Sequence, residues 1–242
     1  MFALLTALAS EAEDFISKTI VGKIDHWNGY KFAIGIFGNQ ECIIASTGIG
    51  KVHSAVVTTH IIDTYNPKAV FYTGIAGALK GDWNIGDVLI ARDCVQWDVD
   101  ITPFGFKPGE LPSGNANPEN TERSDTAQFY STDDDLAAKA LTWKHTGFKV
   151  GTGRILTGDS FISDHLRKER KNLLIDLDGD IAEMEGAAAA AAARMQDVPF
   201  FLARVISDTA DGRKPKRFKQ FLKESSVKMA GLVDHILGND FS

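Results

Sequence analysis

The chain has 242 residues, of which 44% are hydrophobic and 24% are charged, a composition ordinary for a globular protein with a sizeable core. Its formal net charge of −6 gives no electrostatic reason to bind nucleic acid or an anionic membrane, so we expect neither partner. The apolar N-terminal run lacks a basic region and is too short to span a bilayer, which favours a first strand over a signal peptide. Cys42 and Cys94 lie in apolar segments and are expected to be free thiols, as in the cytoplasm.

The first half of the chain predicts strands alternating with helices. Residues 2–8 are apolar apart from Thr6 and predict a strand buried on both faces. Ser10 can cap a helix that runs to about residue 20, with Glu13 completing a capping box. Gly38-Asn39 is a hairpin signal. The further predicted elements are strands at 30–37 and 41–47, a helix at 52–65, and strands at 69–72 and 88–95.

The second half begins with a long region, 96–128, that is rich in turn residues and lacks periodicity. Its nearly all-polar part, 113–125, is predicted to be a mobile insertion. The run of alanines from Ala187 to Ala193 predicts a helix, and Glu183 and Glu185 precede it, where the helix dipole favours negative charge. The other predicted elements are helices at 134–145, 164–173 and 218–237, and strands at 148–156 and 198–206.

Alternation of strands and helices predicts an α/β fold with a largely parallel sheet covered on both faces. No composition break divides the chain, so we expect one domain, residues 1–242. Ligands of such folds bind in the crevice outside the carboxyl ends of the strands. The strands are expected to end in polar or glycine-rich turns at 9–11, 46–50, 73–77, 157–160, 182–186 and 207–211. This arrangement gathers the acidic residues Glu11, Asp159, Glu183, Glu185 and Asp208 near one crevice.

Several common types of catalytic or binding site lack their motifs in this sequence. The six histidines are scattered without metal-ligand spacing, and Gly48-Ile-Gly50 lacks the third glycine of a dinucleotide fingerprint. A Gly-x-Ser-x-Gly hydrolase elbow is also absent from the sequence. Carboxylates whose environments separate their pKa values serve as general acid and base, and cleavage of glycosidic bonds uses them in this way.

Eight segments, collinear over nearly the whole chain, together carry a resemblance. They are Ala7-Leu-Ala-Ser-Glu11, Ser46-Thr-Gly-Ile-Gly-Lys-Val52, Thr73-Gly-Ile-Ala-Gly77, Ile85-Gly-Asp87, Asp98-Val-Asp-Ile-Thr-Pro-Phe-Gly-Phe106, Gly158-Asp-Ser-Phe-Ile162, Glu183-Met-Glu185 and Arg204-Val-Ile-Ser-Asp208. The ordered set resembles the purine nucleoside phosphorylase/nucleosidase superfamily and, within it, the 5′-methylthioadenosine/S-adenosylhomocysteine nucleosidases. This resemblance implies a single α/β domain with a mixed, largely parallel, partly closed twisted sheet, and a reaction that needs no metal or redox cofactor.

The resemblance also implies catalytic roles. Glu11 matches the general base that activates water, and Asp208 the general acid that protonates the leaving adenine. Glu185 matches the residue that binds the ribose 2′- and 3′-hydroxyls, and Met184 would pack on the ribose face. For the three acids the alternative is helix capping, and for Met184 it is a place in the core. Glu183 is expected to be structural.

Other positions match the substrate-binding set. Phe161 would stack on the base and the Ile162 backbone would read the adenine edge, unless both are core residues. Arg204 would lie near the nucleophile, or instead form a salt bridge to a structural acid. Ile75 and Ser207 belong to the same set. Ile49, Ile101, Phe104, Phe106 and Pro112 would line an alkylthio pocket, the last three donated by the second subunit of a homodimer, or would be dimer core alone.

Departures from the family pattern bear on reaction and substrate. The phosphorylase relatives carry an arginine-bearing glycine-rich loop where this chain has Glu11, which favours water over phosphate as nucleophile. Ile75 replaces a frequent serine, removing a hydroxyl that would help to orient Asp208, and Phe106 replaces a frequent tyrosine. The alternatives are a futalosine or aminodeoxyfutalosine nucleosidase, a purine nucleoside phosphorylase, and a nucleoside-binding relative without activity.

Overall fold

The computed structural model describes residues 1–112, 126–209 and 212–238, so the insertion predicted to be mobile, 113–125, lies outside the described residues. The strands are β1 Phe2–Thr6, β2 Thr19–Trp27, β3 Tyr30–Phe37, β4 Gln40–Ser46, β5 Val70–Ala78, β6 Val88–Gln96, β7 Leu111–Pro112, β8 Thr126–Ala127, β9 Tyr130–Ser131, β10 Val150–Thr157, β11 Ile181–Glu183 and β12 Phe200–Asp208. Within the described residues ten of them form one sheet in the order β11-β10-β6-β12-β5-β1-β4-β3-β2, with β9 beside β6.

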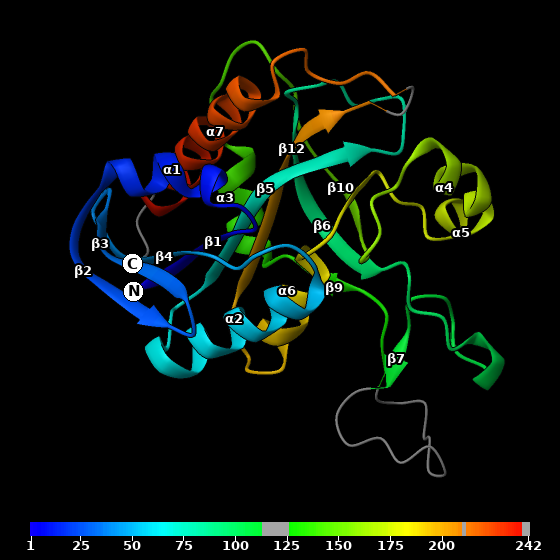
Figure 1. Cartoon of the computed structure of the whole chain (residues 1–242), viewed down its shortest axis with the longest axis horizontal. Coiled ribbons are helices and arrows are strands. Elements are labelled where there is room, and N and C mark those ends of the chain that lie inside the picture. The colour runs from blue at the N-terminus through cyan, green and yellow to red at the C-terminus, as the bar shows by residue number, and fades with distance from the viewer. Residues whose placement is uncertain (113–125, 210–211, 239–242) are drawn as a thin grey trace.

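Helices cover both faces of this sheet (Figure 1). They are α1 Ala9–Lys18, α2 Lys51–Tyr65, α3 Asp134–Leu141, α4 Asp164–Glu169, α5 Lys171–Asp176, α6 Gly186–Arg194 and α7 Phe218–Gly238, with a 3₁₀ turn, η1, at Thr102–Phe104. One core cluster packs α2 and α6 on the sheet, and a second packs α1, α3 and α7 on the opposite face. The alanines of α6 are almost all buried, because their small side chains let the helix lie close to its neighbours.

The predicted α/β fold with a mixed, partly closed sheet is confirmed, and its closure positions the site. Strands β4, β1, β5 and β12 run parallel to one another, and so do β6, β10 and β11, but the two groups are antiparallel where β12 meets β6. The short strand β11 then returns to β5, pairing Ala182 with Gly77. This second pairing closes part of the sheet. It places residues 183–185 beside the end of β5.

Several predicted boundaries were wrong for physical reasons. Strand β2 was missed because it is an edge strand with mostly exposed residues and therefore carries no clear alternation. The glycine-rich segment 73–77, predicted as a turn, is strand because both β12 and β11 pair with it. Ser10 does not cap α1; the helix begins after Leu8. The helix predicted at 164–173 is two short helices, α4 and α5, and the helix predicted at 134–145 ends at Leu141.

Two further expectations concern the cysteines and the absence of a membrane-spanning segment. Cys42 and Cys94 are both buried free thiols, as predicted. In the described parts of the chain, none of the helices is both long and apolar enough to cross a membrane.

Candidate active site

Glu11 lies in the first turn of α1 and its carboxylate turns back over the end of the sheet. One oxygen accepts a hydrogen bond from the Leu8 amide at 2.9 Å and the other from the Ile75 amide at 3.1 Å. The residue is 4% exposed, and this burial raises its pKa, although the two amides and the charge of Arg204 act in the opposite direction. Glu11 is therefore a buried carboxylate held by backbone amides, with a raised pKa suited to accepting a proton.

Two glycines of β5 make room for the acids at the end of the sheet. A Cβ atom at Gly74 would lie 2.8 Å from Glu11 Oε1, and one at Gly77 would lie 2.8 Å from Asp208 Oδ2. Both distances are shorter than side chains tolerate, so neither position accepts a larger residue without moving a carboxylate. The glycines that suggested a turn are therefore strand residues chosen for close approach.

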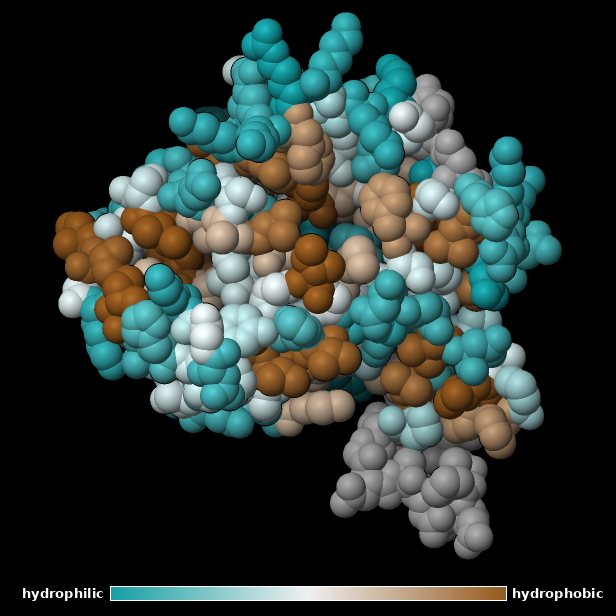
Figure 2. All heavy atoms as spheres, in the orientation of Figure 1, coloured by the Kyte–Doolittle hydropathy of each residue, from teal (hydrophilic) through white to brown (hydrophobic). Residues whose placement is uncertain are grey.

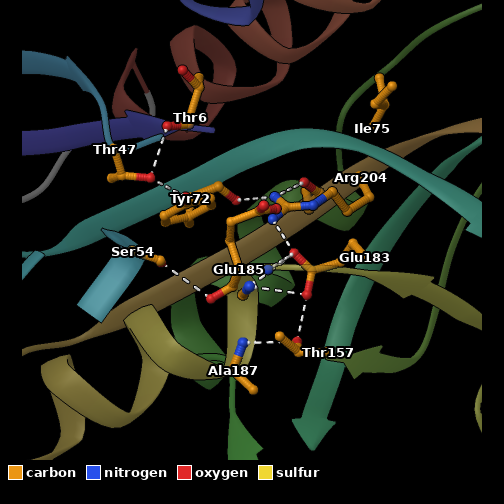
Figure 3. A network of polar contacts seen from close by, with 12 residues as sticks. Thr6, Thr47, Ser54, Tyr72, Ile75, Thr157, Glu183, Glu185, Ala187 and Arg204 are labelled. Carbon is orange, nitrogen blue, oxygen red and sulfur yellow. Dashed lines mark hydrogen bonds and ion pairs between the residues drawn. The ribbon is translucent and has the colours of Figure 1, made fainter. Parts of the chain in front are cut away.

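Glu183 ends β11, and its carboxylate is fully occupied (Figure 3). It accepts hydrogen bonds from the amides of Glu185, at 3.0 Å, and Gly186, at 2.8 Å, and from the Thr157 hydroxyl. It also forms an ion pair with Arg204 Nη2 at 2.5 Å. These contacts cap the start of α6 and engage both carboxylate oxygens in the framework of the protein.

Glu185 occupies the N-cap position of α6 and points to a different partner. Its Oε1 accepts a hydrogen bond from the Gly50 amide at 2.9 Å, and its backbone carbonyl accepts one from the Ser54 hydroxyl at 3.1 Å. Burial, followed by repulsion from Glu183, raises the pKa of Glu185 to about 7, while the charge of Arg204 lowers it. Two glutamates two residues apart thus have separate environments: one neutralised by an arginine, the other able to titrate near neutral pH.

The raised pKa of Glu185 predicts a pH dependence of stability. Between its ordinary pKa of 4.5 and about 7, the folded protein holds a proton that the unfolded chain has released, so stability falls as pH rises. Glu185→Gln removes this loss. We expect the variant to gain stability relative to the wild type between about pH 5 and about pH 8, by up to roughly 3 kcal/mol. Urea unfolding at several pH values measures it, with exposed Glu13→Gln as the control; a pH-independent difference would refute it.

Arg204 lies on β12 and is 1% exposed. Besides the ion pair with Glu183, its Nη1 donates to the carbonyls of Tyr72, at 3.4 Å, and Ala203, at 3.3 Å. The structure therefore gives the second of the two predicted environments, a salt bridge to a structural acid. The same charge acts on the pKa of both Glu11 and Glu185, so Arg204 influences the site without facing an open space.

Asp208 ends β12, directly after a β-bulge that shifts the register against β5. The Ser207 hydroxyl lies 2.8 Å from Asp208 Oδ1 and 3.1 Å from the Ala76 carbonyl. The Ile75 side chain packs on the core beneath α3 and α7, and points away from the polar network in Figure 3. The hydroxyl beside Asp208 comes from Ser207.

A small cavity of about 30 Å³ lies against Asp208. Four residues predicted from the sequence line it, namely Phe161, Ile162, Met184 and Asp208. Gly77 and Glu183 also border it, together with residues to which the sequence gave no role, Leu79, Ser160, Arg167 and Ala182. The apolar ones carry no chemical signature, and Arg167 lies in a charged run that resembles a solvated face. Phe161 is 60% exposed, and Lys214 Nζ lies 5.4 Å from the centroid of its ring.

The five residues predicted to line an alkylthio pocket are not part of this cavity lining. Phe104 is 79% exposed and Ile49 is 57% exposed, while the others are partly buried, namely Ile101, Phe106 and Pro112. Figure 1 shows β7, which holds Pro112, projecting away from the sheet. Figure 2 shows apolar side chains at the surface of the face over α2, where Ile49, Val52 and Val56 are exposed.

Among the described residues, no group of three or more histidine, cysteine, aspartate or glutamate side chains is arranged to hold a metal ion. The described acids at this end of the sheet are instead held by amides, hydroxyls and one arginine. Carboxyl groups held in this way are of the type that can donate or accept protons.

Comparisons with known proteins identify the family of the chain. Residues 2–238 match the family described as the Phosphorylase superfamily. The chain is 33% identical over 208 residues to a 5′-methylthioadenosine/S-adenosylhomocysteine nucleosidase of Staphylococcus haemolyticus, covering 86% of each chain. It is similar to the crystal structure of the nucleosidase of the same name from Campylobacter jejuni, with a TM-score of 0.85, 28% identity and 97% coverage of both chains.

A further solved structure has a different activity in its name. The futalosine hydrolase of Helicobacter pylori gives a TM-score of 0.84 at 30% identity, covering 99% of this chain and 97% of that one. The overall similarity to these two kinds of nucleosidase is alike, whereas the curated relative from Staphylococcus haemolyticus is a 5′-methylthioadenosine/S-adenosylhomocysteine nucleosidase by name. The chain belongs to the phosphorylase superfamily and, within it, to the family of 5′-methylthioadenosine/S-adenosylhomocysteine nucleosidases.

Proposed function

We propose that this protein hydrolyses the N-glycosidic bond of 5′-methylthioadenosine and S-adenosylhomocysteine, releasing adenine and the thioribose product. The observation that carries the proposal is the buried Glu11 carboxylate, whose pKa is raised and which lies against Gly74 of β5, while Asp208 lies against Gly77 of the same strand. The names of the relatives support the choice of substrate. No cofactor is required for this reaction.

In the proposed mechanism, two carboxyl groups act on opposite sides of the bond. Glu11 takes a proton from a water molecule whose oxygen attacks C1′ of the ribose. The bond from C1′ to the adenine nitrogen breaks, and Asp208 donates a proton to the imidazole nitrogen of the leaving base. Ser207 supports this role, because its hydroxyl is within hydrogen-bond distance of Asp208.

The sugar and the base would occupy the space between these acids. Glu185 would accept hydrogen bonds from the ribose hydroxyls, and Met184 would pack on the ribose face. The base would enter the cavity beside Asp208, with Phe161 stacked on its ring and the Ile162 backbone at its edge. The exposure of Phe161 supports this assignment, since an aromatic ring at the rim of a cavity gains burial when a base covers it.

Water, and not phosphate, is the proposed nucleophile. The Glu11 carboxylate would repel a phosphate dianion, and its described hydrogen-bond partners are backbone amides. We expect that adding phosphate will not accelerate cleavage of methylthioadenosine. Product analysis in phosphate and in a phosphate-free buffer tests this, with matched ionic strength as the control. Formation of a ribose 1-phosphate product would instead assign the protein to the phosphorylases.

A second candidate substrate is aminodeoxyfutalosine. The similarity to futalosine hydrolase of Helicobacter pylori favours it, and so does the absence of a serine at Ile75. Both candidates need the same acids, so their comparison depends on the 5′ substituent alone. Turnover of methylthioadenosine and of aminodeoxyfutalosine by the same preparation would separate them: a higher kcat/KM for aminodeoxyfutalosine would overturn the first assignment.

We also propose a homodimer in which Phe104, Phe106 and Pro112 lie near the neighbouring subunit's site and, with Ile49 and Ile101, form its alkylthio pocket. Exposed apolar side chains at Phe104 and Ile49 support it, because such residues gain burial in an interface. Sedimentation that finds a stable, active monomer would contradict the dimer. The proposed substrates place the reaction in methionine salvage. The buried free thiols support a location in the cytoplasm, where thiols stay reduced.

A further inference from the structure

The start of α2 and two loops that carry proposed substrate contacts meet at one lysine, Lys51. Its Nζ forms an ion pair with Asp98 Oδ1 at 2.7 Å and lies 3.9 Å from Asp159 Oδ2. The Lys51 backbone amide also donates a hydrogen bond to Asp159 Oδ1 at 2.9 Å. The Asp159 amide donates in turn to Asp98 Oδ2, again at 2.9 Å. These four contacts join Lys51, Asp98 and Asp159 into one closed cluster, which we call the loop clamp.

Each residue of the loop clamp belongs to a different segment: Lys51 begins α2, and Asp98 and Asp159 lie in two loops. Lys51 follows Gly50, whose amide donates to Glu185, so its segment bears on the ribose side of the site. Asp159 lies two residues before Phe161, which lines the cavity beside Asp208. Asp98 begins the segment that leads to η1 and so to the apolar residues at 101–106. The loop clamp therefore links the three segments that are proposed to contact the ribose, the base and the 5′-alkylthio group of the substrate.

Asp159 also completes the start of α2. The N-cap of this helix is Gly50, which has no side chain and has a φ of +93°. A Cβ atom at Gly50 would lie 3.2 Å from Asp159 Oδ1, so the glycine permits this aspartate to approach. Asp159 reaches over from its own loop and replaces the N-cap side chain that Gly50 lacks. The position of the Asp159 loop therefore depends on the position of α2.

We propose that Lys51 and Asp98 are positioning residues, which hold the loop of residues 157–163 against the start of α2 so that the base is bound and oriented. This inference rests on the proposed function. The clamp lies at the surface: the Lys51 side chain is 16% exposed, that of Asp98 is 21% exposed and that of Asp159 is 51% exposed. Ion pairs in such surroundings add little to folding stability, so its loss should affect binding and leave the fold intact.

The test compares Lys51→Met with the conservative variant Lys51→Arg and with Lys23→Met, which removes an exposed lysine from an ion pair on β2. We expect Lys51→Met to raise both KM for methylthioadenosine and the inhibition constant of adenine by about tenfold, the loss expected for one charged hydrogen bond. Its kcat should change by less than about threefold, and its melting temperature by less than about 3 °C. Lys51→Arg should restore most of the affinity, and Lys23→Met should change nothing.

A double-mutant cycle and a measurement without substrate complete the design. In Asp98→Asn, the new amide NH₂ must face either Lys51 Nζ or the Asp159 amide, so the clamp opens. The Lys51→Met/Asp98→Asn variant should lose no more affinity than the worse single variant, whereas additive losses would overturn the shared network. Hydrogen exchange of residues 157–163 in the free protein should accelerate in Lys51→Met.

The two hypotheses fail in different ways. If the wild type releases no adenine, the proposed function is wrong, but the exchange measurement still decides whether the clamp orders the loop. If the wild type is active while Lys51→Met keeps normal KM, adenine affinity and exchange rates, the positioning role is wrong. A fall in melting temperature that accompanies an equal loss of kcat and affinity would show a purely structural role and would also overturn the proposal.

Discussion

Replacing Asp208 with asparagine is expected to reduce kcat for adenine release from methylthioadenosine by about 10³-fold, the usual contribution of one general acid. Asparagine preserves the size of the side chain and still presents an oxygen to the Ser207 hydroxyl, which lies 2.8 Å from Asp208 Oδ1. It has no proton to donate to the leaving base, so the expected loss is in kcat, with KM little changed. The measurement is adenine release at saturating substrate.

The matched control is Asp63→Asn, which removes an exposed carboxylate from α2 and should leave kcat unchanged. If Asp208→Asn retains more than about a tenth of wild-type kcat, Asp208 is not the general acid. If the wild type itself releases no adenine, the alternative of a nucleoside-binding protein without this activity gains support.

Replacing Glu183 with glutamine is expected to destabilise the protein by about 3–5 kcal/mol, the usual result of leaving one member of a buried ion pair unpaired. The side chain of Arg204 is 1% exposed and that of Glu183 is 2% exposed, so water cannot replace the lost charge. The variant also places a glutamine NH₂ among the donors from Glu185, Gly186 and Thr157. Urea unfolding near pH 7 measures the loss.

Two further variants make this prediction specific. Glu41→Gln changes an exposed glutamate on β4 and should alter stability by less than about 0.5 kcal/mol. Adding Arg204→Met to Glu183→Gln removes the uncompensated charge and should recover part of the lost stability. A Glu183→Gln variant as stable as Glu41→Gln would mean that the ion pair contributes nothing to the fold.

The structure gives Glu183 and Glu185 different surroundings, which the residue types alone could not distinguish. Both residues precede the same helix, and either could cap it. In the structure Glu183 takes the amides and the arginine, whereas Glu185 receives the Gly50 amide and has its pKa raised to about 7. Glu183 is therefore held by an ion pair and by backbone amides, whereas Glu185 can change its protonation state near neutral pH.

Local patterns predicted the elements whose signals come from neighbours in sequence. The hairpin of β3 and β4 follows from Gly38-Asn39, helix α6 from its alanines, and α2 and β6 from their apolar runs. Patterns failed where distant strands decide. Segment 73–77 has turn residues, yet it is strand because β11 and β12 supply its hydrogen bonds. The edge strand β2 lacked the one-sided burial that produces an alternating pattern.

The sequence by itself determined the α/β class and the presence of acids after the strands, because strand and helix periodicity and capping residues act over a few positions. Through its family resemblance, it also named Glu11, Glu185 and Asp208 as the acids to examine. Only the tertiary structure decided the partner of each acid. The pairing of β11 with β5, the clearances at Gly74 and Gly77, and the burial of Arg204 join residues far apart in the chain. Burial in this arrangement raises the pKa of Glu11 and of Glu185.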